Sequence, residues 1–153
     1  MGVGTMELIG VGIDLVDIAR VERMLERHGE RVITRFLTEG EREYVTGRFR
    51  PALHIAARMA AKEAAYKALQ SLPDARAVSW QDLEVERAHD GRPSLKLLGL
   101  AAELAAKHGP FDIQLSLSHS DRTAGAVAVL VRVSSTHRCT PISSRIVRRA
   151  RTA

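Results

Sequence analysis

The feature that most constrains the fold is a long helical segment at residues 52–70, ALHIAARMAAKEAAYKALQ. It is dominated by strong helix formers and contains neither glycine nor proline. The sequence Leu72-Pro73-Asp74 then breaks the helix. We therefore expect the remaining elements to be arranged around one long helix.

The rest of the chain predicts a mixture of strands and shorter helices. The run LIGVGIDLV predicts a buried strand, and the later alternation of apolar and polar residues predicts half-buried strands. Thr38 and Glu41 fit a capping box at the start of a short helix. The predicted strands are 8–16, 83–85, 95–97, 113–118 and 125–133, and the predicted shorter helices are 17–29, 38–46 and 98–107. The fold class is therefore α+β, a single domain with a small antiparallel sheet packed on the long helix.

The net charge of +5 belongs to the end of the chain. Six of the 23 basic residues lie from Arg132 onward, where there is no acidic residue, which leaves 17 basic against 18 acidic residues and a net charge of −1 before it. The last twenty residues have few large apolar side chains, which is typical of a solvated extension. We expect a domain at 1–133 and a basic, poorly ordered tail at 134–153.

Composition excludes several classes of protein. At 153 residues, 45% hydrophobic and 27% charged, the chain has the composition of one globular domain. No apolar run approaches the roughly 20 residues that a membrane helix needs. A single cysteine, Cys139, excludes an internal disulfide framework. We expect a soluble, cytoplasmic protein that binds neither membrane nor nucleic acid.

Two acidic residues lie in apolar surroundings, where an unpaired carboxylate is costly. Asp14 lies between Ile13 and Leu15, and Glu63 lies within AAKEAAY of the long helix. Asp14 could simply bond backbone amides at a strand end, and Glu63 could pair with Lys67 one turn later. If the strand and the helix instead bring both carboxylates together, they suit Mg²⁺, which combines a few protein oxygens with substrate phosphates.

The long helix also carries cations beside Glu63. Lys67 could neutralise a phosphate oxygen, Arg58 could bind a phosphate with two donors, and His54 lies at the start of the same helix. Lys62 adds a further positive charge. Since the chain has no Walker loop and no GxGxxG motif, phosphate chemistry here would depend on a metal and on side chains.

Five segments in this order resemble holo-[acyl-carrier-protein] synthases, members of the 4'-phosphopantetheinyl transferase family. They are GVGIDLVDIARVERM, LTEGE, RMAAKEAAYKAL, DGRP and LSLSHS, and the resemblance extends from about Leu8 to Val131. It implies transfer of the 4'-phosphopantetheine arm of coenzyme A to a serine of apo-acyl carrier protein, with release of 3',5'-ADP, in fatty acid or polyketide biosynthesis. It also implies a homotrimer with active sites between neighbouring subunits.

The resemblance implies a role for each matching residue. Asp14 and Glu63 would hold Mg²⁺ against the pyrophosphate of coenzyme A, and Lys67 would act with Glu63 in catalysis. Coenzyme A would also contact Lys67. The other residues expected to contact coenzyme A are His54, Arg58 and His119. The proton acceptor for the serine stays open between a metal-bound water, Glu63, Glu41 and Glu43.

The segment after the long helix departs from the family pattern. Many members have a Gly-Thr-Gly loop there, whereas this chain has Leu69-Gln70-Ser71-Leu72-Pro73-Asp74. An inactive protein that keeps the fold is therefore one alternative. The other alternative is a module that binds nucleic acid or an acidic surface, for which the body's charge of −1 is unfavourable.

The first predicted helix carries a basic stripe formed by Arg20, Arg23, Arg27 and Arg31. These residues fall within an arc of roughly 80° around the helix axis. By itself this pattern is typical of a solvated face with Glu26 and Glu30 as neighbours. With an acidic carrier protein as partner, Arg20, Arg23 and Arg27 become the expected docking surface.

Overall fold

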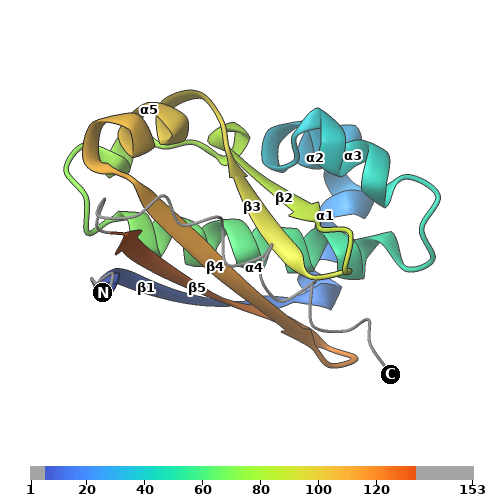
Figure 1. The fold of residues 1–153 in the computed structure, drawn as a ribbon. Helices are drawn as coiled ribbons and strands as arrows, with labels where there is room; N and C mark the ends of the chain where they lie inside the picture. Colours follow the sequence, from blue (N-terminus) through green and yellow to red (C-terminus); the bar gives the residue numbers. More distant parts are fainter. Residues whose placement is uncertain (1–5, 134–153) are drawn as a thin grey trace, which may run out of the picture.

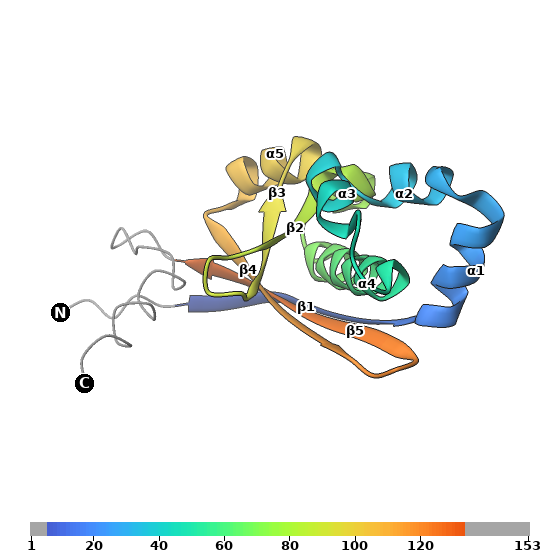
Figure 2. The ribbon, with the colours of Figure 1, turned by 90° about the vertical axis from the view of Figure 1, so that its right-hand side faces the viewer.

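The computed structural model describes residues 6–133, and the predicted tail at 134–153 lies outside that range. The long helix α4 (Pro51–Leu69) runs through the middle of the molecule (Figure 1). Figure 2 shows the three-stranded sheet on one side of α4 and the smaller helices with the β2–β3 hairpin on the other. The expected arrangement around one long helix is confirmed.

The α+β fold class is confirmed, with two antiparallel sheets. The larger sheet has the strand order β1-β5-β4, and the smaller one pairs β2 with β3. The strands are β1 (Met6–Asp17), β2 (Leu83–Arg87), β3 (Pro93–Leu97), β4 (Phe111–His119) and β5 (Thr123–Val133). The other helices are α1 (Ile18–His28), α2 (Glu30–Phe36), α3 (Glu39–Val45) and α5 (Gly99–His108), with 3₁₀ turns η1 (Ala75–Ala77) and η2 (Trp80–Asp82).

Local sequence accounts for most element boundaries. Asp17 caps α1 by accepting a hydrogen bond from the Arg20 amide at 2.7 Å. The predicted capping box of Thr38 and Glu41 is present at the start of α3. Sequence analysis missed α2, which begins directly after Gly29, at φ 49°. Because Gly29 separates the two helices, the basic stripe of α1 ends before Arg31.

Strand β1 lies unusually close to α4 because two of its residues have no side chain. A Cβ at Gly12 would lie 1.8 Å from the carbonyl oxygen of Ala64, and one at Gly10 would lie 2.2 Å from that of Ala68. The facing residues of α4 are fully buried alanines. Backbone therefore packs directly on backbone along this contact, which needs glycine on the strand and alanine on the helix.

The face of the larger sheet that points away from α4 is apolar, and its β1 side chains are exposed. In β1, Val11, Ile13 and Leu15 are 56%, 61% and 70% exposed. They pair with β5, where Val127 and Val129 lie opposite Ile13 and Val11. A sheet face of this composition is normally buried against another surface.

No helix among the described residues is both long and apolar enough to cross a bilayer.

The β1–α4 contact predicts that Gly12→Ala lowers the free energy of unfolding by about 3 kcal/mol, because the added methyl would overlap backbone that cannot move aside. Urea denaturation measures this change. The matched control is Gly40→Ala in α3, where the new Cβ would meet only the end of the Glu84 side chain, at 3.1 Å. An equal, small loss in both variants would contradict the proposed close contact.

Candidate active site

Asp14 and Lys67 form an ion pair where β1 crosses α4. Asp14 follows Gly10 and Gly12 at alternate positions of the strand, so it points to the same side, toward the helix. The Lys67 ammonium donates to Asp14 Oδ1 at 2.8 Å and to the Ile13 carbonyl at 3.0 Å. The side chains of Lys67 and Asp14 are 45% and 20% exposed, so a ligand can reach both. Lys67 thus pairs with Asp14, and the alternative pair with Glu63 does not form.

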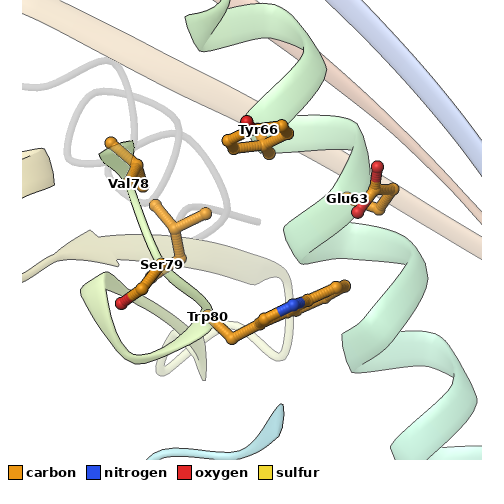
Figure 3. Close-up of a pocket in the computed structure, with 6 residues that line it drawn as sticks. Glu63, Tyr66, Val78, Ser79 and Trp80 are labelled. Carbon is orange, nitrogen blue, oxygen red and sulfur yellow. The ribbon is translucent and has the colours of Figure 1, made fainter. Parts of the chain in front are cut away.

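Glu63 lies one helical turn before Lys67, which places their Cβ atoms roughly 5–6 Å apart. It borders a pocket of about 280 Å³ between α4 and the segment that precedes β2. In Figure 3, Tyr66 projects from α4 toward the Val78–Ser79 segment, and the Trp80 ring extends toward the turn of α4 that carries Glu63. The full lining is Glu63, Tyr66, Val78, Ser79, Trp80 and Leu83. Two of the three predicted catalytic and metal-binding residues therefore meet at the β1–α4 crossing, and the third opens onto an adjacent pocket.

The carboxylates of Asp14 and Glu63 are the kind of donor that a divalent cation shared with a ligand requires. Within residues 6–133 there is no group of three or more His, Cys, Asp or Glu side chains that could enclose a metal. Asp14 and Glu63 supply only two carboxylates, both hard oxygen donors. Mg²⁺ commonly uses one or two carboxylates and completes its shell with water and phosphate oxygens.

Lys62 and Glu41 form a second ion pair, and both side chains are fully buried. The Lys62 ammonium also donates to the carbonyls of Phe36 at 2.7 Å and Trp80 at 2.8 Å. Burial lowers the pKa of Lys62, and the carboxylate of Glu41 opposes that shift. The sequence counted Lys62 among the cations of the long helix and left Glu41 open as one candidate proton acceptor. Both side chains are fully buried, so neither group can reach a ligand.

The N-terminal half of α4 gathers the other predicted contacts to coenzyme A. The Arg58 guanidinium is 3.9 Å from the Tyr44 ring centre and donates to the His54 carbonyl at 3.3 Å. Arg58 is 7% exposed, and its Nε has no hydrogen-bond partner in the described part of the chain. The Arg58 Nε–H is therefore a buried donor without an acceptor among the described residues.

The end of β4 lies close to the same half of α4. Arg50, the residue before α4, donates to the Asp121 carbonyl in the β4–β5 turn at 3.4 Å. His119, the exposed last residue of β4, is near enough to His54 to affect its pKa. Burial lowers the pKa of His54 below 6.5, and the nearby guanidinium groups of Arg58 and Arg48 lower it further. His54 thus lies in a basic environment, within electrostatic range of His119.

The three predicted docking arginines are all exposed on α1. The helix buries Ile18 and Val21 on its other side, which leaves Arg20, Arg23 and Arg27 facing solvent. Since α1 follows β1 directly, the stripe begins six residues after Asp14.

The segment that departs from the family pattern is ordered against the core. Leu72 and Ala75 are 7% and 1% exposed, and Asp74 adopts a left-handed conformation at φ 66°. The Tyr66 hydroxyl donates to the Arg76 carbonyl at 3.3 Å, which ties this segment to α4. The segment therefore has a defined shape without the glycines of the family loop.

Sequence reasoning missed the pocket wall opposite Glu63, formed by Ser79 and Trp80. Trp80 is the only tryptophan of the chain, and it follows a helix-breaking segment at the entry to a strand. That position was the one available signal, because aromatic side chains with a polar end are common in binding sites.

Comparison with known proteins gives a consistent result. A family model described as the 4'-phosphopantetheinyl transferase superfamily matches residues 10–128. A holo-[acyl-carrier-protein] synthase of Moorella thermoacetica is 42% identical over 123 residues, which cover 80% of this chain and 94% of that protein. One from Paramagnetospirillum magneticum is 47% identical over 129 residues, covering 81% and 95%. The crystal structure of a Bacillus anthracis holo-(acyl-carrier-protein) synthase in complex with CoA (3',5'-ADP) matches with a TM-score of 0.67 and 33% identity, covering 84% of this chain and 99% of that one.

The basic environment of His54 predicts that its imidazole titrates below pH 6.5 and is neutral at pH 7. Arg48→Gln should raise the midpoint, because one positive charge that disfavours the imidazolium is removed. NMR titration of the histidine ring protons measures both values, with Arg87→Gln on β2 as a control that should leave the midpoint unchanged. A midpoint of 6.5 or higher for His54 would contradict this description of the site.

Proposed function

The chain belongs to the 4'-phosphopantetheinyl transferase superfamily, and from this premise we propose that it acts as a holo-[acyl-carrier-protein] synthase. In this reaction the serine hydroxyl oxygen of apo-acyl carrier protein attacks the phosphorus of coenzyme A that bears the pantetheine arm. A new P–O bond forms to serine, and the P–O bond to the adenosine-bearing phosphate breaks. 3',5'-ADP leaves with the bridging oxygen, and the serine proton passes to a base.

The contact between Asp14 and Lys67 beside Glu63 is the observation that best supports this reaction. It places a carboxylate and an ammonium within 2.8 Å at a partly exposed position, next to a second carboxylate that borders a pocket. Phosphoryl transfer depends mainly on positioning and on neutralising phosphate charge. Two carboxylates that bind a cation and a lysine that binds a phosphate oxygen would meet those two requirements.

We propose that Asp14 and Glu63 hold Mg²⁺, which when bound supplies positive charge to the pyrophosphate oxygens. Lys67 is flexible and partly exposed, so its ammonium can turn from Asp14 to a phosphate oxygen when a ligand arrives. Lys67 then favours departure of 3',5'-ADP by neutralising the charge that develops on it.

Of the two candidate carboxylates Glu41 and Glu63, Glu63 fits better as the proton acceptor. Glu41 is 1% exposed and accepts hydrogen bonds from the amides of Thr38 and Val85 in addition to its pairing with Lys62. Glu63 borders the pocket and is accessible to a ligand. We therefore assign the serine proton to Glu63, directly or through one water.

We assign His54, Arg58 and His119 to the adenosine end of coenzyme A. His54 precedes Glu63 by nine residues, which is about 13.5 Å along the helix axis. The guanidinium charge of Arg58 and the two histidines form a basic group suited to a phosphate far from the reacting bond. Ligand phosphate there would favour the charged form of His54.

The apolar face of the larger sheet, exposed along β1, supports the homotrimer that the sequence led us to expect. We propose that neighbouring subunits cover it, since a second copy offers an apolar face of the same kind. Sedimentation equilibrium should then give three times the chain mass, and a monomer at micromolar concentration would contradict this arrangement.

The proposal has three further parts. They are a cytoplasmic location, a role in fatty acid or polyketide biosynthesis, and a domain that ends at residue 133.

The proposed metal site predicts that Asp14→Asn and Glu63→Gln each slow transfer by about a hundredfold or more while the fold survives, because a transition-state charge loses its counter-charge. The assay incubates the chain with apo-carrier protein, coenzyme A and Mg²⁺ and follows the carrier by mass spectrometry. The wild-type protein should add the mass of one phosphopantetheine arm.

Two matched variants separate this effect from a general loss of carboxylates. Asp112→Asn on β4 and Glu103→Gln on α5 make the same chemical changes away from the β1–α4 crossing and should keep wild-type rates. An unmodified carrier with the wild-type protein would contradict the proposed activity. Wild-type rates for Asp14→Asn would contradict the metal assignment alone.

The basic stripe predicts a different kinetic effect. Arg27→Glu, and more strongly Arg20→Glu/Arg27→Glu, should raise KM for the carrier protein and weaken its salt dependence, because exposed charges act mainly on encounter. KM for coenzyme A should stay the same. Lys107→Glu is the matched control, since Lys107 lies in the last turn of α5 as Arg27 lies in the last turn of α1. An unchanged carrier KM for the double variant would show that the carrier docks elsewhere.

A further inference from the structure

The buried ammonium of Lys62 is fully used by three acceptors. It pairs with Glu41 and donates to the carbonyls of Phe36 and Trp80 at 2.7 and 2.8 Å. An ammonium has three N–H donors, so each finds one acceptor. A fully buried lysine is rare unless it is paired, and here the pairing reaches three separate segments of the chain.

Two of those acceptors belong to segments that are already joined to each other. Phe36 is the last residue of α2, and Trp80 is the first residue of η2. Gln81 donates from its side-chain amide to the carbonyls of Thr34 and Leu37, both at 3.0 Å. The end of α2 and η2 therefore form one unit, and Lys62 links that unit to α4.

This link adjoins two residues that line the pocket. Lys62 immediately precedes Glu63 in α4, whereas Trp80 forms the opposite wall (Figure 3). The Trp80 ring packs edge-on against Phe36, with the ring centres 4.9 Å apart and the planes at 79°. Lys62 thus holds the backbone of both members of this aromatic pair, and of the two Trp80 lines the pocket.

The pocket suits an uncharged ligand group. Its lining contains aromatic and aliphatic side chains, one serine and Glu63, and no cation. Phosphates would be unfavourable inside it, but a chain of amide and methylene groups that starts at a pyrophosphate near Glu63 would match it. The pantetheine arm of coenzyme A has this chemistry, whereas 3',5'-ADP lacks the arm.

We propose that Lys62 is a positioning residue: by holding the carbonyls of Phe36 and Trp80, it keeps the Trp80 side chain opposite Glu63 and Tyr66 and so shapes the pocket for the pantetheine arm. This inference rests on the proposed function for the identity of the ligand. Lys62 itself contacts no substrate, because it is fully buried.

A purely structural role for Lys62 would have a different kinetic signature. If its loss only reduced the folded fraction, kcat per chain would fall and KM for coenzyme A would stay the same. If the pocket wall moves, contacts made equally in the ground state and the transition state are lost, so KM for coenzyme A rises and kcat at saturation is kept.

The test compares Lys62→Met with the wild-type protein in ligand binding and turnover. Trp80 is the only tryptophan, so its fluorescence reports on the pocket wall directly. In the wild-type protein, coenzyme A added with Mg²⁺ should change Trp80 emission. In Lys62→Met, we expect emission shifted to longer wavelength and a Kd and KM for coenzyme A raised about tenfold, as for lost packing in a pocket. The Kd of 3',5'-ADP should change less than about twofold, because that ligand does not enter the pocket.

Two further variants keep the test decisive if Lys62→Met is unstable. Glu41→Gln disturbs the same buried pair but leaves Lys62 its bonds to both carbonyls, so the coenzyme A Kd should stay at the wild-type value. Glu41→Gln/Lys62→Met removes the unpaired buried charge while still lacking both bonds, and it should show the raised Kd.

The outcomes separate this inference from the proposed function. Equal weakening of coenzyme A and 3',5'-ADP, or a raised Kd in Glu41→Gln as well, would overturn the positioning role. A Trp80 emission that does not respond to coenzyme A in the wild-type protein would overturn it too. A Lys62-dependent response without transfer to a carrier would support the inference and contradict the proposed transferase activity.

Discussion

The site depends on the direct packing of β1 backbone against α4 backbone. Gly12 and Ala64 approach so closely that even one methyl group on the strand would overlap the helix carbonyl. This contact sets how far Asp14, two residues later, lies from the charged residues of α4. The ion pair of Asp14 and Lys67 is therefore a consequence of small residues that carry no chemistry themselves.

The two lysine ion pairs that α4 makes with other elements differ in burial and therefore in function. Lys62 and Glu41 are enclosed and fully hydrogen-bonded, so they join segments of the fold and cannot exchange partners with a ligand. Lys67 and Asp14 are partly exposed, so their pairing can be replaced by pairing to a cation and a phosphate. Lys62 and Lys67, five residues apart on one helix, thus have different functions, because Lys62 faces the interior and Lys67 faces β1.

Much of the fold could be predicted from local sequence, and the reason differs between elements. The alanine-rich α4, the capping box of α3 and the alternation in β4 are local patterns that packing did not override. Helix α2 was missed because one glycine, Gly29, separates it from α1. Glu63 and Asp14 could be singled out as carboxylates in apolar surroundings. The burial of Lys62 and the pocket wall at Trp80 could not, because each depends on contacts between segments distant in sequence.

We propose that β1 and α4 together present a cation site that the pyrophosphate of coenzyme A completes. Binding of Mn²⁺, followed by electron paramagnetic resonance of the free ion, tests it most directly. The wild-type chain should bind little Mn²⁺ alone, because Lys67 occupies Asp14, and about one ion per site once coenzyme A is added. Asp14→Asn should lose that coenzyme A-dependent binding. Undiminished Mn²⁺ binding by Asp14→Asn in the presence of coenzyme A would contradict the account.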